Sequence, residues 1–192
     1  MESTRRRLVL AHESARLETA PPLTGSPRDA LTVRRAVAAD AAAVCDVGVT
    51  AWRATYSDLV GAEAIERFVG QSYTVERIAS RIERDVMFVA GHPGGDPSGV
   101  DAFIEVVEEE DRPHIVAFYA RPASRGRGLG TALLAEVVAV FPGRDISADV
   151  LEGNHLGEPF YVARGFEPGD LLVEDIAGEA IRERRWWLRA ER

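Results

Sequence analysis

The sequence predicts one mixed α/β domain without internal repeats. Stretches in which apolar and polar residues alternate, as in half-buried strands, are interleaved with stretches in which apolar residues recur at helical spacing. The 192 residues leave room for one domain and a tail. A glycine-rich loop, Arg121–Thr131, stands between an apolar strand and a long helical stretch. This arrangement offers the N–H groups of a helix start to an anion.

Residues 1–30 are expected to form a disordered tail, and residues 31–192 the domain. The first segment combines Arg5–Arg7 with mixed charges and prolines, and it lacks a periodic apolar face. The apolar run Leu8–Ala11 is too short for the core of a secretory signal peptide. We therefore expect the tail to contribute little to folding.

The first half of the domain predicts a strand, three helices and a hairpin. Asp40 is expected to cap the first helix, because a carboxylate before an apolar-periodic run accepts free N–H groups. Glycines and prolines in Gly91–Gly99 predict the turn of the hairpin. In order, the elements are a strand at Leu31–Val37, helices at Ala41–Trp52, Ala62–Phe68 and Val75–Arg84, and strands at Val86–Ala90 and Val100–Val107.

The second half continues with strands and helices in alternation. Pro142 is expected to stop the long helix, and Gly165 to cap the short one at its C-terminus. The acidic run Glu108–Asp111 is read as a solvated turn or as an acidic rim that attracts a cation. In order, the elements are strands at Ile115–Ala120 and Ile146–Leu151 with the helix Thr131–Phe141 between them, a short helix through Tyr161–Arg164, and strands around Leu171 and Arg184–Leu188.

Composition excludes several classes of function. The net charge of −8 and the pI of about 5.1 argue against nucleic-acid binding, which depends on cations, and favour a cationic or neutral partner. All 23 basic residues are arginine, so neither a Walker A lysine nor a Schiff-base lysine is present. The single Cys45 and the four scattered histidines predict neither a disulfide nor a metal site. No apolar run approaches the roughly 18 residues of a membrane span, so we expect a cytoplasmic protein.

The loop Arg121–Thr131 carries the chemistry that the sequence suggests. Its glycines allow the backbone to approach a ligand closely, and the helix start that follows suits a pyrophosphate. Gly126 and Gly128 are followed by Thr131 where the dinucleotide fingerprint G-x-G-x-x-G has its third glycine. The loop therefore fits a phosphate-bearing ligand better than it fits a Rossmann-type dinucleotide.

Three linked motifs resemble the GNAT family of N-acetyltransferases. Arg125, Gly128 and Gly130 match the family's R/Q-x-x-G-x-G/A signature, and Phe118–Pro122 is similar to the strand and proline that precede it. Downstream, Asn154 and the segment from Phe160 to Phe166 resemble the family's N-x-x-A-x-x-F-Y-x-x-x-G-F motif, with Gly157 in place of the usual alanine.

The resemblance implies the GNAT fold: a twisted, mostly antiparallel mixed sheet of six to seven strands flanked by about four helices, with the fourth and fifth strands splayed apart. It implies acetyl-coenzyme A as the acyl donor, with its pantetheine in the gap between those strands. The implied cofactor-binding residues are Phe118, Tyr119, Ala120, Arg125, Gly126, Arg127, Gly128, Leu129, Gly130, Thr131 and Asn154.

The resemblance also implies direct attack by an amine on the thioester, without an acyl-enzyme. Tyr161 is the expected general acid that protonates the departing thiolate, and Glu105 the expected general base, with Glu108 behind it. The acceptor is expected to be a small-molecule amine or a peptide N-terminus. A non-catalytic module that binds acyl-coenzyme A and regulates a partner remains an alternative, and a nucleotide-binding protein a third.

Several residues have a structural interpretation beside the functional one. Asn154 either contacts the cofactor or caps the next helix. Trp52, Arg53, Thr55 and Tyr56 either line the acceptor site or fill the core. Trp186 and Trp187 alternate on one strand, so one of them is left to face solvent or a homodimer partner.

Overall fold

The computed structural model describes residues 31–96 and 98–190, and the tail expected at residues 1–30 lies outside them. In the described residues, seven strands form one sheet with the order β1-β2-β3-β4-β5-β7-β6. Strands β4 and β5 run parallel, whereas the other neighbours are antiparallel. The strands are β1 (Thr32–Arg35), β2 (Val86–Gly91), β3 (Ala102–Glu109), β4 (Arg112–Ala120), β5 (Ile146–Leu151), β6 (Glu167–Ile176) and β7 (Glu179–Leu188).

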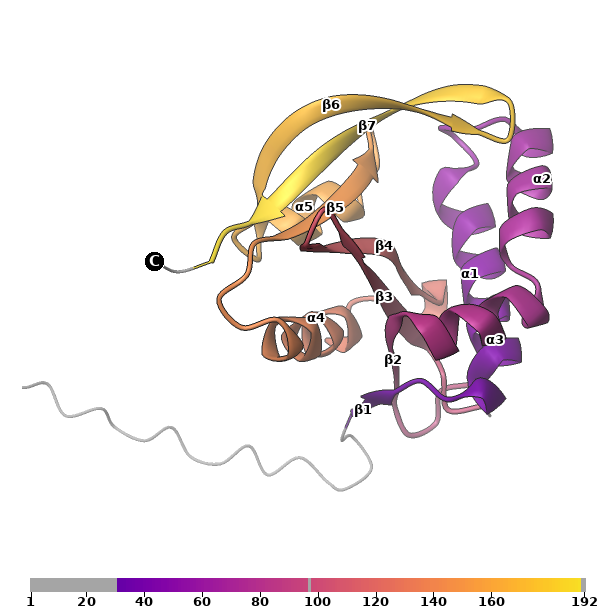
Figure 1. The fold of residues 1–192 in the computed structure, drawn as a ribbon. Helices are drawn as coiled ribbons and strands as arrows, with labels where there is room; N and C mark the ends of the chain where they lie inside the picture. Colours follow the sequence, from indigo (N-terminus) through magenta and orange to yellow (C-terminus); the bar gives the residue numbers. More distant parts are fainter. Residues whose placement is uncertain (1–30, 97, 191–192) are drawn as a thin grey trace, which may run out of the picture.

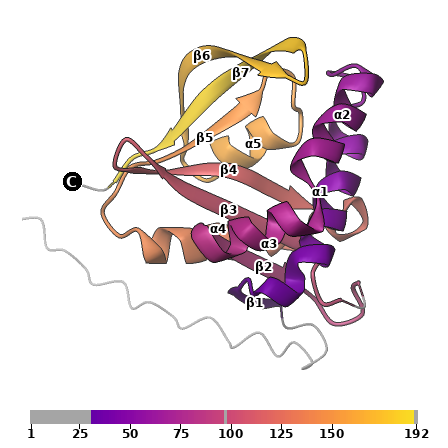
Figure 2. The same cartoon turned by 45° about the vertical axis from the view of Figure 1, so that its right-hand side comes forward.

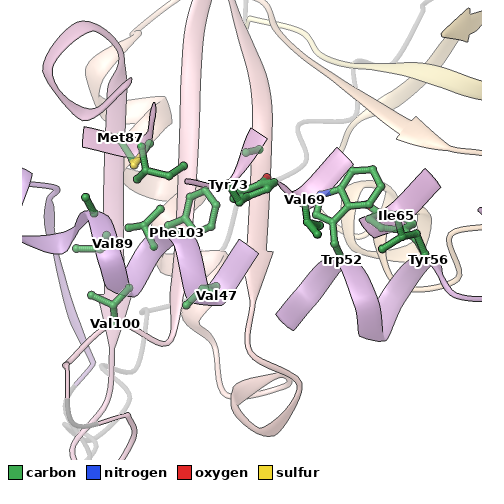
Figure 3. Close-up of a cluster of buried hydrophobic side chains, with 14 of the residues drawn as sticks. Val47, Trp52, Tyr56, Ile65, Val69, Tyr73, Met87, Val89, Val100 and Phe103 are labelled. Carbon is green, nitrogen blue, oxygen red and sulfur yellow. The ribbon is translucent and has the colours of Figure 1, made fainter. Parts of the chain in front are cut away.

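Helices cover both faces of the sheet (Figures 1 and 2). On one face, α1 (Ala41–Tyr56), α2 (Ala62–Ser72) and α3 (Val75–Arg84) enclose a core that includes Trp52, Tyr73 and Phe103 (Figure 3). On the other face, α4 (Leu129–Val140) and α5 (Gly157–Val162) enclose a second core around Ile104 and Leu133. The described residues also contain two short 3-10 helices, η1 (Ala38–Asp40) and η2 (Pro122–Ser124). The expected fold class is therefore confirmed.

Strands β4 and β5 separate soon after they pair. His114 pairs with Ser147 and Ile115 with Ala148, and the ladder ends there. On the other side of β4, Glu105 pairs with Ala117 and Val106 with Ile115, so that Val116 is an extra residue in β4. Such a bulge bends its strand and increases the local twist. The bulge therefore turns the end of β4 away from β5, which confirms the expected splay.

Most predicted elements are present, with some shifted boundaries. The helix predicted to end at Trp52 continues to Tyr56, because the two aromatic residues lie one turn apart on the same buried face. Asp40 occupies the N-cap position of α1, but its side chain makes no cap bond. Instead it accepts hydrogen bonds from the guanidinium of Arg34 and from the N–H of Val37. The expected cap is thus replaced by a bond that closes the preceding turn.

The long β6–β7 hairpin reaches across to α2, as Figure 1 shows. The guanidinium of Arg67 donates to the carbonyl oxygen of Ala177 at 3.1 and 2.9 Å. The N–H of Gly61, just before α2, donates to Glu179 Oε2 at 3.0 Å. These bonds join the hairpin tip to the layer of helices formed by α1, α2 and α3.

Within the described residues, no helix combines the length and the apolar character that a membrane crossing requires.

Helix α3 is joined to the sheet by a buried ion pair. Thr74 caps the helix by accepting a hydrogen bond from the N–H of Arg77. Ile78 and Ile82 face the core, and on the same side the guanidinium of Arg81 pairs with both carboxylate oxygens of Glu105 on β3. Glu105 is 1% exposed, so Arg81 supplies the positive charge that this site requires.

We expect Arg81→Met to lower the free energy of unfolding by about 3 to 5 kcal/mol, because it leaves a buried carboxylate without a cation. Adding Glu105→Leu should restore most of that loss, since apolar residues often replace a buried ion pair at little cost. The exposed Arg77 on the same helix provides the control variant Arg77→Met. Urea unfolding at pH 7 measures the free energy of unfolding of wild type, Arg81→Met, the double variant and Arg77→Met. Equal stability of wild type and Arg81→Met would contradict the expectation.

Candidate active site

A cavity of about 450 Å³ opens where β4 and β5 have separated. Its walls come from the end of β4, the glycine-rich loop, the start of α4, and α5. The structure brings together around it Tyr161 and all the expected cofactor-binding residues except Arg127, which is exposed and outside the lining. The lining also contains residues that sequence reasoning did not single out for the cofactor: Thr55, Tyr56, Ser124, Leu156, Gly157, Phe160 and Arg164.

The glycine-rich loop ends in a conformation that favours glycine. Gly128, the N-cap residue of α4, has φ +85°, and Gly126 has φ +74°. Side-chain-bearing residues rarely adopt these left-handed values. The first N–H groups of α4, which have no partner within the helix, belong to residues that line the cavity. The loop can therefore bind an anion through its backbone.

Gly130 has a different role from Gly128. A Cβ at Gly130 would lie 2.8 Å from Cε2 of Phe160, so α4 and α5 pack against each other at this point. The second glycine of the signature thus permits close helix packing, and this packing places α5 along the cavity. The distinction depends on a contact between segments that are distant in the sequence, so the motif alone does not reveal it.

Two arginines lie beside the loop. Arg125 donates a hydrogen bond to Oγ1 of Thr55 on α1 at 2.7 Å. The guanidinium carbon of Arg164 lies 3.6 Å from the centre of the Phe160 ring, and the same guanidinium contacts Oγ1 of Thr131 at the start of α4. Within the described residues, Nε of Arg164 is buried without a hydrogen-bond partner. Both side chains therefore add positive charge near the helix start. Arg164 was missed because the motif that contains it leaves its position unspecified.

Tyr161 lies in the cavity wall on α5. It is 6% exposed, and its ring packs at steep angles against Phe118, Phe160 and Phe166. Burial raises the pKa of Tyr161 well above its usual value, so the phenol stays protonated at neutral pH. The aromatic neighbours fix the ring, and the hydroxyl can donate a proton to a group in the cavity.

Asn154 joins the cavity to the start of α5. Its Oδ1 accepts hydrogen bonds from the N–H groups of Leu156 and Gly157 at 3.1 and 3.0 Å. Its Nδ2 donates to the hydroxyl of Tyr56 at 3.4 Å. A Cβ at Gly157 would lie 2.9 Å from Nδ2 of Asn154, which explains the glycine where the resembling motif has alanine. Asn154 therefore caps the turn before α5 and also lines the cavity.

The aromatic residues of α1 belong to the core, and one of them also reaches the cavity. Trp52 and Tyr56 are both buried in the first core, and Tyr56, together with Thr55, also lines the cavity. Burial raises the pKa of Tyr56 to about 12. Arg53 points to solvent, where it pairs with Glu66. On β7, Trp186 is buried, whereas Trp187 is half-buried beneath the guanidinium groups of Arg112 and Arg189.

The structure does not bring Glu105 to the cavity. Its carboxylate lies on the α3 side of β3, where it is held by Arg81 and is absent from the lining. Burial raises the pKa of Glu105, and the hydrogen bond from Arg81 opposes that shift. Glu108, at the far end of β3, pairs with Arg144 at 2.6 Å. Neither acidic side chain is therefore aimed at the gap between β4 and β5.

Charged and polar residues gather on one face where β4 and β5 still pair. Nδ1 of His114 lies 2.9 Å from Oγ of Ser147, and Nε2 of His114 lies 3.6 Å from Asp149. Arg185 on β7 forms two hydrogen bonds with Asp149, at 2.8 and 2.7 Å. Burial lowers the pKa of His114, so the imidazole is neutral at pH 7. Within the described residues, no group of acidic, histidine and cysteine side chains has the arrangement of a metal site.

Comparisons with known proteins identify a related sequence and related folds. A spermidine N(1)-acetyltransferase from Thermoplasma acidophilum is 24% identical over 165 residues, which are 81% of this chain and 98% of the relative. The PaiA N-acetyltransferase from Thermoplasma acidophilum, solved in complex with coenzyme A, superposes with a TM-score of 0.67 at 21% identity. That match covers 84% of this chain and 99% of the other. YncA from Salmonella typhimurium, solved with its cofactor acetyl-CoA, superposes with a TM-score of 0.57 at 17% identity. That match covers 84% of this chain and 95% of YncA.

The family comparison covers the site itself. The family model described as the acetyltransferase (GNAT) family matches residues 53–166, more than half of the chain. This range begins in α1 beside the cavity and ends at Phe166, so it includes the glycine-rich loop, α4 and α5. The chain therefore belongs to the GNAT family of acetyltransferases, and it is an acyltransferase.

Proposed function

We propose that this protein transfers an acetyl group from acetyl-coenzyme A to a primary amine of a small cationic molecule of the polyamine type. The observation that carries the proposal is the cavity in the gap between β4 and β5, with a helix start at one end and Tyr161 in its wall. The cavity offers groups for an anion, for an extended amide chain and for a leaving thiolate. These are the three chemical parts of the donor.

The pyrophosphate of the donor fits the loop between η2 and α4. N–H groups at the start of a helix carry partial positive charge, and each such contact contributes about 0.3 to 1 kcal/mol. Gly126 and Gly128 leave the backbone open to a ligand, since a Cβ at Gly126 would meet nothing within 4 Å. Arg125 and Arg164 also line the cavity and add positive charge beside the loop. Several weak contacts and two guanidinium groups together account for binding of a doubly charged group.

The pantetheine arm fits the gap itself. Beyond Ile115, β4 has no ladder with β5 in the part of the chain that the structure describes, so its backbone groups on that edge are available. An extended chain with amide groups can bind such an edge as an added strand does. This places the thioester near the backbone of Phe118–Ala120, where an N–H group would polarise the carbonyl and stabilise its developing negative charge.

The chemistry requires one proton donor at the sulfur. The amine nitrogen forms a bond to the carbonyl carbon, and the C–S bond breaks as its electron pair moves to sulfur. Tyr161, held protonated by burial, donates its proton to the departing thiolate. The nitrogen, which is positively charged once the C–N bond has formed, loses a proton to the resulting phenolate or to solvent, which yields the neutral amide and restores the phenol. No covalent acyl-enzyme is needed, because the amine attacks the thioester directly.

A polyamine acceptor is supported by charge and by similarity. The chain has a net charge of −8, and the curated relative acts, by its name, on spermidine. An acidic surface attracts cations and raises their local concentration. The direct test is release of free thiol from acetyl-coenzyme A in the presence of spermidine, compared with a peptide that has a free N-terminus. Binding of acetyl-coenzyme A without thiol release from any amine would identify the regulatory alternative instead.

Gly128→Asp should weaken binding of acetyl-coenzyme A by at least about tenfold. The new side chain strains a left-handed residue and places a negative charge beside the phosphates. Gly143→Asp is the matched control, because Gly143 has φ +69°, has open space around it and lies at the other end of α4. Calorimetric titration measures the affinities of both variants for acetyl-coenzyme A, coenzyme A and NADH. Equal affinities for acetyl-coenzyme A in the two folded variants would show that the donor binds elsewhere.

Tyr161→Phe should lower kcat by roughly 10²-fold and change the affinity for acetyl-coenzyme A by less than about threefold. The ring and its aromatic contacts remain, while the proton donor is lost. Tyr73→Phe is the control, since Tyr73 is also buried, its pKa is raised to about 12, and it lies outside the cavity lining. Thiol release at saturating substrates measures kcat. An unchanged kcat under conditions where chemistry limits the rate would remove Tyr161 from the mechanism.

A further inference from the structure

Glu183 on β7 lies on the face of the sheet that looks toward α1. It pairs with Leu151, the last residue of β5, and with Leu172 of β6. Residues directly opposite in an antiparallel pair point to the same face, and Leu151 belongs to the core shared with Tyr56. The Glu183 carboxylate therefore lies on the side of the sheet opposite α4 and α5, near the end of β5 that borders the gap.

The Glu183 carboxylate has no cation of its own. Arg185, the next residue on the same face, is engaged by Asp149 and by Glu109. Arg182 and Arg184 alternate onto the other face of β7, where both pair with Glu152. Among residues 31–96 and 98–190, Glu183 forms neither an ion pair nor a hydrogen bond through its side chain. It is half-buried, so water compensates its charge incompletely.

The surroundings of Glu183 disfavour its negative charge. Burial is the main cause that raises the pKa of Glu183 to about 7, Asp149 and Glu174 add to the shift, and Arg185 opposes it. The charge of Glu183 in turn contributes to the raised pKa of Tyr56, which lines the cavity. Glu183 does not line the cavity itself, but it acts on Tyr56, which does. A half-buried carboxylate that lacks a cation and lies near such a cavity is suited to receive a cation from outside.

We propose that Glu183 binds the ammonium group of the acceptor and removes its proton before the amine attacks the thioester. This inference rests on the proposed function and names the base for it. The proton moves from the ammonium nitrogen to a carboxylate oxygen of Glu183, which leaves a neutral amine and a neutral carboxyl group. The amine lone pair then forms the C–N bond, and the nitrogen gives up its second proton to the phenolate left on Tyr161 or to solvent as the thiol departs. Glu183 releases its own proton to solvent after the product leaves.

Other acidic or basic groups on this side are less suited to the task. Glu105 is paired with Arg81, and Asp149 is paired with Arg185. His114 is neutral and buried, but its Nδ1 is engaged by Ser147 and its Nε2 faces Asp149. Glu183 combines partial exposure, an unpaired carboxylate and a pKa close to neutral, which is the range in which a general base is most effective.

The test compares Glu183→Gln with Glu174→Gln. The amide keeps the shape of the side chain and removes its charge and basicity. Glu174 is the matched control, because it has the same side chain on the neighbouring strand β6, contributes to the same local field and is exposed. Initial rates of thiol release with spermidine are measured from pH 6 to pH 10, and circular dichroism and the melting temperature verify folding.

We expect kcat/KM of wild type for spermidine to rise through about pH 7, as Glu183 loses its proton. At pH 7, kcat/KM of Glu183→Gln should be about 10²-fold lower than that of wild type, while kcat/KM of Glu174→Gln should stay within about twofold of wild type. The Glu183→Gln rate should then rise about tenfold per pH unit toward the amine pKa of about 10.4, because the variant must capture amine that is already neutral. The deficit should thus shrink steadily as the pH increases.

Each outcome decides between explanations. A loss in Glu183→Gln that is the same at every pH would assign Glu183 a structural role and overturn the inference, as would a pH profile equal to that of wild type. In both cases wild-type turnover of spermidine leaves the proposed function intact. Wild type that releases no thiol with any amine would overturn the proposed function, and the role of Glu183 as base with it.

Discussion

The structure depends on the bulge in β4. By inserting Val116 into the strand, the chain keeps the antiparallel ladder with β3 on one edge and abandons the parallel ladder with β5 on the other. Backbone groups that a sheet normally pairs become available for an added chain, at the point where two cores hold the strands rigidly from both faces. Ile115 and Ala148 lie in the second core and His114 bonds to Ser147, so the closed end of the gap is well fixed.

The two helical layers have different tasks around this gap. Helices α4 and α5 line the cavity on one side, and the contact of Gly130 with Phe160 sets how closely they approach. That contact brings Tyr161 and Arg164 to the same cavity as the loop glycines. Helices α1 and α2 form the opposite side, and the bonds of Gly61 and Arg67 to the β6–β7 hairpin tie the two parts together. Reactive groups thus sit on elements whose positions are fixed by packing, which favours catalysis by positioning.

The acidic groups of the sheet differ in whether a cation accompanies them. Arg81 neutralises Glu105, and Arg185 neutralises Asp149. These pairs are structural, because each joins two elements and leaves little basicity free. Glu183 differs in that its neighbours on the same face are acidic or already paired. The contrast shows that paired carboxylates join elements of the fold, whereas Glu183 keeps its charge free for another group.

The sequence by itself determined the order of elements, two of them with the bounds that the structure has, Val75–Arg84 and Ile146–Leu151, and the loop at the start of α4. These features depend on local periodicity and on glycine conformation, which are legible along the chain. Tertiary structure decided that Asp40 bonds back to its own turn and that Gly130 serves packing. It also decided that Glu105 is paired away from the cavity, whereas Glu183 stays half-buried among acidic neighbours. Each of these depends on which distant segments meet, because burial and ion pairing arise from contacts between strands and helices and not from the spacing of residues within one segment.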